Sequence, residues 1–130
     1  MGGLTRLPTL PRMTDVTIYH NARCSNSRGA LALIRERGIE PHIVDYVAQP
    51  LNSAQLTALV ARLGVPVRDL LRTKEAVYQA LNVADPQWTD AQLIDFVAQH
   101  PVLLNRPIVV TERGARLCRP PERVLDLLPM

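Results

Sequence analysis

A cysteine at the start of a predicted helix is the residue of this chain best suited to chemistry. Residues 16–28 read VTIYHNARCSNSR: a short β-rich run, a polar turn, and then Cys24 where an amphipathic helix begins. A thiol at a helix N-terminus lies in the partial positive charge of unpaired backbone N–H groups, which favours the thiolate. Arg23 is adjacent and Arg28 follows one turn later, so we expect both cations to favour the thiolate as well. The pattern predicts a nucleophilic cysteine.

The alternative for Cys24 is a structural role, because free cysteines are among the most buried residues and pack as small hydrophobic side chains. Its neighbours argue against this role, since they are arginines, serines and an asparagine. Charged and polar side chains seldom surround a core thiol. The second cysteine, Cys118, lies in a strand-like pattern, and we interpret it as a packing thiol rather than a resolving partner.

Composition narrows the classes of protein. The chain has 130 residues, enough for a core without disulfides. Its two cysteines form no disulfide framework, and the ligand spacings of zinc sites are absent. A reducing, cytoplasmic compartment fits this cysteine usage best. The net charge of +3 is too small to indicate nucleic acid as a partner.

The cations are nearly all arginine, 14 of them against one lysine, Lys74. A guanidinium group matches oxyanions in bidentate fashion, which a lysine cannot do. A genome-wide coding bias toward arginine would produce the same composition. The total alone therefore does not identify an anion site.

The first residues differ from the rest of the chain. Residues 1–13 contain prolines and glycines and have no helical or strand period, so we expect a disordered extension. No apolar run is long enough for a signal peptide or a membrane span, and we expect no membrane partner. Residues 14–130 are predicted to form a single domain.

The elements that must position Cys24 form a predicted βαβ unit. Residues 16–19 are a strand, the helix after Cys24 runs to about Arg37 with Gly38 as its left-handed cap, and residues 42–47 are a second strand. A strand, a helix and a strand in such short succession predict two parallel strands joined by a right-handed crossover.

The middle of the chain is predicted to be helical. Asn52 or Ser53 caps a helix that Gly64 ends, and Thr89 and Gln92 form a capping box for another helix. Shorter helical segments are expected between them, at residues 67–72 and around residues 77–81.

The last third returns to strands. Residues 107–111 and 116–119, separated by a turn at residues 112–115, predict a β-hairpin. Pro120 and Pro121 then begin a final helix whose Val124, Leu125 and Leu128 are expected to face inward.

This order of elements, with Cys24 at the first strand–helix junction, is similar to a thioredoxin-like α/β fold with a helical insertion between the second and third strands. The Cys-Ser-Asn-Ser at residues 24–27 also resembles the Cys-x-x-Ser of monothiol glutaredoxins. Five blocks between about residue 18 and residue 128 form a wider pattern: Tyr19-His20-Asn21 with Cys24 and Ser27-Arg28, Leu70-Leu71-Arg72, Leu93-Ile94-Asp95, Asn105-Arg106-Pro107-Ile108-Val109-Val110, and Arg119-Pro120. In this order the blocks resemble the glutaredoxin-linked arsenate reductase (ArsC) family.

The resemblance implies a catalytic role for three residues near the first helix. Cys24 corresponds to the cysteine that forms a thiol–arsenate adduct. His20 matches a histidine that helps to lower the cysteine pKa, and Ser27 matches a hydroxyl close to the thiolate. A thiolate near neutral pH is needed because the thiol itself is a poor nucleophile.

The resemblance also implies a substrate site. Arg72, Arg106 and Arg119 match the family's three arginines that hold the arsenic oxyanion and stabilise the intermediate. Guanidinium groups around the oxyanion would offset its repulsion of the thiolate. Pro107 stands where thioredoxin-like folds have a cis-proline facing the nucleophile, so the resemblance implies a cis bond there.

The mechanism implied is arsenate reduction without a bound cofactor. The Cys24 thiolate displaces an oxygen of arsenate, glutathione attacks the adduct as co-substrate, and glutaredoxin supplies the electrons that complete reduction to arsenite. No metal, flavin or nicotinamide is called for. The phosphatase-like arsenate reductases match poorly, because Ala30 stands where they need an arginine six residues after the cysteine.

Two other functions share the fold. Redox-responsive transcription regulators of the Spx type bind RNA polymerase and use a Cys-x-x-Cys switch, which Ser27 argues against here. A glutathione-dependent thiol oxidoreductase acting on another substrate would need the thiol but no oxyanion site. Ala22, where the family commonly has proline, is the main departure from the family's pattern near the cysteine.

Overall fold

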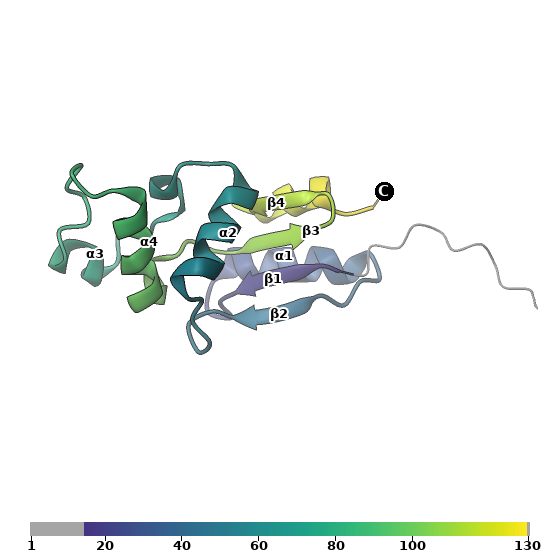
Figure 1. The fold of residues 1–130 in the computed structure, drawn as a ribbon. Coiled ribbons are helices and arrows are strands. Elements are labelled where there is room, and N and C mark those ends of the chain that lie inside the picture. Colours follow the sequence, from purple (N-terminus) through teal and green to yellow (C-terminus); the bar gives the residue numbers. More distant parts are fainter. Residues whose placement is uncertain (1–14, 130) are drawn as a thin grey trace, which may run out of the picture.

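A four-stranded mixed sheet runs through the part of the chain that the computed structural model describes, residues 15–129 (Figure 1). The expected extension at residues 1–13 lies outside this range. The elements in chain order are β1 (Thr17–His20), α1 (Ser25–Glu36), β2 (His42–Asp45), α2 (Ser53–Leu63), the 3₁₀ helix η2 (Val67–Leu70), α3 (Ala76–Ala80), α4 (Asp90–Gln99), the 3₁₀ helix η3 (Pro101–Leu103), β3 (Ile108–Thr111), β4 (Gly114–Leu117) and the 3₁₀ helix η4 (Pro121–Leu127).

The strand order is β2-β1-β3-β4. β1 and β2 are parallel, with Ile18 opposite Ile43, and the crossover between them is α1. β3 is antiparallel to both of its neighbours, β1 and β4. This topology is thioredoxin-like, and the helices from α2 to η3 are the insertion between the second and third strands, so the predicted fold class is confirmed.

Each face of the sheet has its own apolar core. Alternate residues of a strand point to opposite faces, so Ile108 and Val109 belong to different cores. In Figure 1, α2 lies in front of the sheet and α1 behind it. The core on the α1 side consists of Val16, Ile18, Ala30, Ile34, Val109, Cys118, Val124, Leu127 and Leu128. The other core joins Ile108 to the insertion helices.

The two longer helices of the insertion begin and end near the predicted positions, and Asn52 rather than Ser53 is the cap of α2. Asn52 and Gln55 form a capping box at α2, Thr89 and Gln92 form one at α4, and Gly64 ends α2 with a φ of 68°. No helix among residues 15–129 is both long and apolar enough to cross a membrane.

Backbone bonds tie the insertion to the segment before β3. The amide of Arg72 donates to the carbonyl of Leu103 at 2.8 Å, and the amide of Asn105 donates to the carbonyl of Leu70 at 2.8 Å. These bonds flank an isolated antiparallel bridge between Leu71 and Leu104. Arg72 and Arg106 are distant in sequence, but each lies within two residues of this bridge.

The predicted bounds of the second and the last strand are wrong. The second predicted strand ends at Asp45, because its carboxylate accepts hydrogen bonds from the amides of Val47 and Ala48 and turns the chain. The hairpin turn is shorter than the predicted 112–115: Thr111 pairs with Gly114, and β4 begins there rather than at residue 116. Gly114 has a φ of 144°, a conformation that favours glycine.

The predicted final helix is a 3₁₀ helix. With three residues per turn, Val124 and Leu127 fall on the same buried side, and Leu128 follows them into the core. Leu125, which the helical pattern placed inward, is only partly buried. The predicted segment at residues 67–72 is likewise a 3₁₀ helix that ends at Leu70.

Candidate active site

Cys24 is the N-cap residue of α1. Its backbone is extended, with φ −93° and ψ 124°, its amide donates to the carbonyl of Asn21 at 2.9 Å, and its carbonyl accepts from the amide of Arg28 at 3.0 Å. The side chain is partly exposed. The turn between β1 and α1 therefore holds the sulfur at the helix N-terminus, where unpaired amides can face it.

The surroundings of Cys24 favour the thiolate. Partial burial raises the pKa of the thiol, but hydrogen bonds from the Ser27 amide, the Arg106 guanidinium, the Asn26 amide and the Ser27 hydroxyl lower it more, to about 7 from the ordinary 9.0. A large fraction of Cys24 is therefore a thiolate at neutral pH. The expected contributions of Arg23 and Arg28 are not among these causes: the guanidinium of Arg28 donates to the carbonyl of Ala22 instead.

Arg119 approaches the same sulfur from the end of β4. Its Nη1 lies 3.7 Å from Cys24 Sγ and donates to the carbonyl of Arg106 at 2.9 Å. With the amide oxygen of Asn26 turned toward it, Arg119 also donates to that oxygen from Nη1 at 3.2 Å and from Nη2 at 3.3 Å. The structure thus brings Arg106 and Arg119 together beside Cys24.

Both of these arginines precede a proline in a cis peptide bond, Arg106–Pro107 and Arg119–Pro120. The first is the isomer that the family resemblance implied. The carbonyl of Pro107 accepts a hydrogen bond from the amide of Cys118 at 2.8 Å, so the two arginine-containing segments run side by side at the β3–β4 end of the site.

Arg72 joins this group through Asn105. The Oδ1 atom of Asn105 accepts from Arg72 Nη1 at 3.4 Å and from the backbone amide of Arg106 at 3.0 Å. On its other side Arg72 forms an ion pair with Glu75, with Nε 3.1 Å from the carboxylate. Arg72 therefore lies beside Arg106. Within residues 15–129 it forms no hydrogen bond with Cys24.

Tyr46 lies between the same arginines. Its hydroxyl donates to the carbonyl of Leu104 at 3.1 Å, and the ring is almost fully buried. Burial raises the pKa of Tyr46, while the charge of Arg106, a hydrogen bond with Asn21 and the charge of Arg72 oppose that rise. The phenol thus stays protonated, and its hydroxyl is the polar end of a buried ring.

One donor of Arg106 has no protein partner. Within residues 15–129, its Nε atom is buried and makes no hydrogen bond. Leaving a charged donor buried without a partner is costly, and an oxyanion bound beside Cys24 would supply an acceptor. The arrangement of charge at this site therefore suits a small tetrahedral anion.

The two other predicted residues differ in their relation to the sulfur. Ser27 is fully buried, and its hydroxyl accepts from the amide of Asn21 at 3.3 Å as well as supporting the thiolate.

His20 is buried, with an Nδ1 atom that has no partner among the described residues. Burial lowers the pKa of His20, Asp45 raises it, and Arg35 and Arg28 lower it again, so its ring is neutral near pH 7. It is not among the groups that lower the pKa of Cys24.

Cys118 is fully buried, and burial raises its pKa to about 12. It is a packing thiol, as predicted. Among residues 15–129, no three side chains of histidine, cysteine, aspartate or glutamate lie close enough together to hold a metal ion.

Sequence reasoning missed Asn26, Tyr46 and the linking role of Asn105. Asn26 and Asn105 lie inside the matched blocks, beside Cys24 and Arg106, so their positions were visible although their contacts were not. The sequence pattern does not indicate Tyr46, because its hydroxyl reaches the carbonyl of Leu104 only after the chain has folded.

The fold and this site define a thioredoxin-like protein with a single reactive thiol that faces arginines. A protein-family model described as the ArsC family matches residues 19–127. An arsenate reductase of Escherichia coli (strain K12) is 50% identical over 117 residues, which cover 90% of this chain and 83% of that protein. The chain belongs to the ArsC family.

A solved structure and a second relative extend the comparison. The structure of an arsenate reductase from Vibrio cholerae superposes with a TM-score of 0.86 at 42% identity, covering 90% of this chain and all of that one (100%). An uncharacterised protein of Escherichia coli (strain K12), YfgD, is 45% identical over 115 residues, covering 88% of this chain and 97% of that protein.

Proposed function

We propose that this chain reduces arsenate to arsenite in the cytoplasm, with Cys24 as the nucleophile and with glutathione and glutaredoxin as the thiol donors. The observation that carries the proposal is the Cys24 sulfur, whose pKa is lowered to about 7 while two arginines, Arg106 and Arg119, face it. The identity of about half to arsenate reductases over most of the chain supports arsenate as the oxyanion.

Arsenate binds between the arginines in the first stage. Arg106 offers its free Nε donor, and Arg119 neutralises charge beside the sulfur. Arg72, which the insertion carries, provides the third guanidinium group around the anion. The Cys24 thiolate attacks arsenic(V), an arsenic–sulfur bond forms, and one arsenate oxygen leaves as water after taking up protons. The arginines lower the barrier because they offset the repulsion between two anions.

External thiols complete the reduction. The thiol of glutathione replaces a second oxygen on arsenic, which again leaves as water. A glutaredoxin thiolate then attacks the glutathione sulfur. The bond between arsenic and the glutathione sulfur breaks, and its electron pair stays on arsenic. The products are arsenic(III), still bonded to Cys24, and a mixed disulfide of glutaredoxin and glutathione. Water hydrolyses the remaining bond to Cys24 and releases arsenite and the thiol.

Two residues assist without contacting the arsenic in this proposal. The Ser27 hydroxyl and amide hold the Cys24 thiolate before attack and receive it back after hydrolysis. His20 is kept neutral by burial, so its role is to support the turn that carries Cys24 rather than to provide a positive charge.

A coupled assay tests the proposal. Arsenate, glutathione and glutaredoxin are supplied together and each is omitted in turn, with wild type compared with Cys24→Ser and with Cys118→Ser as the matched control. We expect turnover that needs all three components, that is lost in Cys24→Ser and that persists in Cys118→Ser. Wild-type protein without arsenate-dependent turnover, or a Cys24→Ser variant that keeps it, would overturn the proposal.

A further inference from the structure

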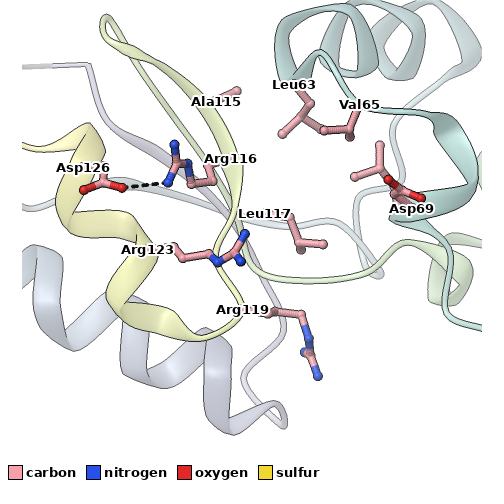
Figure 2. A pocket seen from close by; sticks show the side chains of 10 residues that line it. Leu63, Val65, Asp69, Ala115, Arg116, Leu117, Arg119, Arg123 and Asp126 are labelled. Carbon is pink, nitrogen blue, oxygen red and sulfur yellow. Dashed lines mark hydrogen bonds and ion pairs between the residues drawn. The ribbon is translucent and has the colours of Figure 1, made fainter.

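A charged groove lies next to the site and shares one residue with it. The groove has a volume of about 700 Å³ and runs between the α2–η2 segment and the β4–η4 segment. Figure 2 shows Leu63, Val65 and Asp69 on one wall and Arg116 and Arg123 on the other, with Arg119 at the lower edge. Arg119 also lies 3.7 Å from Cys24 Sγ, so this one residue borders both the groove and the reacting sulfur.

The chain itself offers no second thiol for the reaction. It has two cysteines, and the one not at the site, Cys118, is fully buried in an apolar core. Ser27, three residues after Cys24, has no sulfur. The thiol that attacks the arsenic adduct must therefore come from outside and reach Cys24 along an open surface.

The charges of the groove suit a small peptide that carries a carboxylate and an ammonium group. Arg116 is already paired with Asp126, with 2.7 Å between Nη1 and the carboxylate. Among the described residues Arg123 has no ion-pair partner, and its side chain points into the groove (Figure 2). Asp69, exposed on the opposite wall, carries the complementary charge for an ammonium group. A groove of this volume is in the range of small-molecule sites, about 300–1,000 Å³.

We propose that this groove binds a small anionic thiol peptide of the glutathione type, with one carboxylate on Arg123 and its ammonium group on Asp69, and directs the thiol past Arg119 to the arsenic on Cys24. The inference rests on the proposed function and adds the location of its co-substrate. The bound thiol replaces an arsenic oxygen that leaves as water, so this step changes no oxidation state. Glutaredoxin then meets the glutathione sulfur at the mouth of the groove.

Binding is measured first without arsenate, so that the result does not depend on turnover. The full chain, labelled with ¹⁵N, is titrated with S-methylglutathione, whose sulfur is blocked. We expect amide shifts at residues 63–70 and 114–123, and binding weakened about three- to tenfold in Arg123→Ala. Arg35→Ala, which removes an exposed guanidinium on α1 that is paired with Glu40 and lies outside the groove, is the control and should bind as wild type.

A second variant tests the opposite wall. Asp69→Asn should weaken binding of S-methylglutathione but not of its N-acetyl derivative, which lacks the ammonium group. In the coupled assay, Arg123→Ala should raise the KM for glutathione by the same factor while the KM for arsenate stays at the wild-type value.

The outcomes separate the two proposals. Shifts confined to other surfaces, or binding that Arg123→Ala leaves unchanged, would overturn the groove assignment even if arsenate turnover is normal. A rise in the KM for glutaredoxin instead of glutathione would also overturn it, because the groove would then receive a protein. Binding in the groove by a protein without arsenate turnover would leave the groove in place and remove the proposed function.

Discussion

The Nη1 atom of Arg119 lies 3.7 Å from the Sγ atom of Cys24, although 95 positions separate the two residues in the sequence. The contact exists because β4 ends, and α1 begins, at the same edge of the sheet, the edge past which α3 and α4 extend in Figure 1. The same guanidinium donates to the carbonyl of Arg106. One side chain thus connects the thiolate, the second arginine and the adjacent groove.

Replacing Arg106 should affect both the thiol and the anion. Arg106→Gln removes a hydrogen bond that lowers the pKa of Cys24, so that pKa should rise and the alkylation rate at pH 7 should fall. The same change removes the free Nε donor, and we expect kcat/KM for arsenate to fall by roughly 10²- to 10³-fold. Iodoacetamide kinetics and the coupled assay measure the two effects. A variant with the wild-type thiol pKa would contradict the assigned hydrogen bond.

Replacing Arg119 should weaken anion binding more than it affects the thiol. Its guanidinium lies 3.7 Å from Cys24 Sγ, so Arg119→Ala should raise the pKa of Cys24 and slow alkylation at pH 7, while kcat/KM for arsenate falls by roughly 10²-fold. Turnover of a small glutathione mixed disulfide, which needs no oxyanion site, serves as the control. Unchanged arsenate turnover would instead favour a general thiol oxidoreductase.

Asn105 should act as a positioning residue. Its Oδ1 atom accepts from both Arg72 and the amide of Arg106, so Asn105→Ala should let both arginines move. A small displacement of groups that bind the substrate costs roughly 10- to 100-fold in kcat/KM. We expect this loss to appear mainly as a higher KM for arsenate, together with a rise in the pKa of Cys24 that is smaller than in Arg106→Gln. A uniform loss of all activities together with a lower unfolding temperature would indicate a purely structural role.

Cys118 should be unreactive in the folded protein. Its thiol is fully buried and its pKa is raised to about 12, so alkylation of native protein should modify Cys24 alone, and modification of Cys118 should require denaturant. Mass spectrometry after peptide digestion distinguishes the two sites. Cys118→Ala should keep arsenate turnover and lower the free energy of unfolding by about 1 kcal/mol. Modification of Cys118 in native protein at the rate of Cys24 would contradict its burial.

The parts of the fold that depend on residues close together in the sequence were predictable. The cap at Asn52 or Ser53, the capping box at Thr89 and the left-handed glycines at positions 38 and 64 are local signals, and the structure contains each of them, with Asn52 as the first cap. The 3₁₀ form of η4 was not predictable, because it is set by packing of Val124 and Leu127 under the sheet. The start of β4 at Gly114 depends on its register with β3, which the sequence left open.

The site also has a part that the local sequence predicts and a part that only the fold determines. The position of Cys24 at the end of a strand and the start of a helix follows from local pattern, but the groups that lower its pKa do not. The sequence favoured Arg23 and Arg28 because they are close along the chain, whereas the hydrogen bond comes from Arg106, which folding brings across the sheet. The family resemblance indicated Arg106 and Arg119 in advance, and their roles in substrate binding stay predictions.

The most direct test of the account is the pH dependence of Cys24 alkylation in the wild-type protein. Only the thiolate reacts, so the rate should rise with pH and level off above the pKa of Cys24, which is lowered to about 7. About half of Cys24 should then be reactive at pH 7, against roughly 1% for an unperturbed thiol with a pKa near 9. A midpoint near 7 supports a thiolate held for attack on an oxyanion. A midpoint near the ordinary 9.0 would contradict the account.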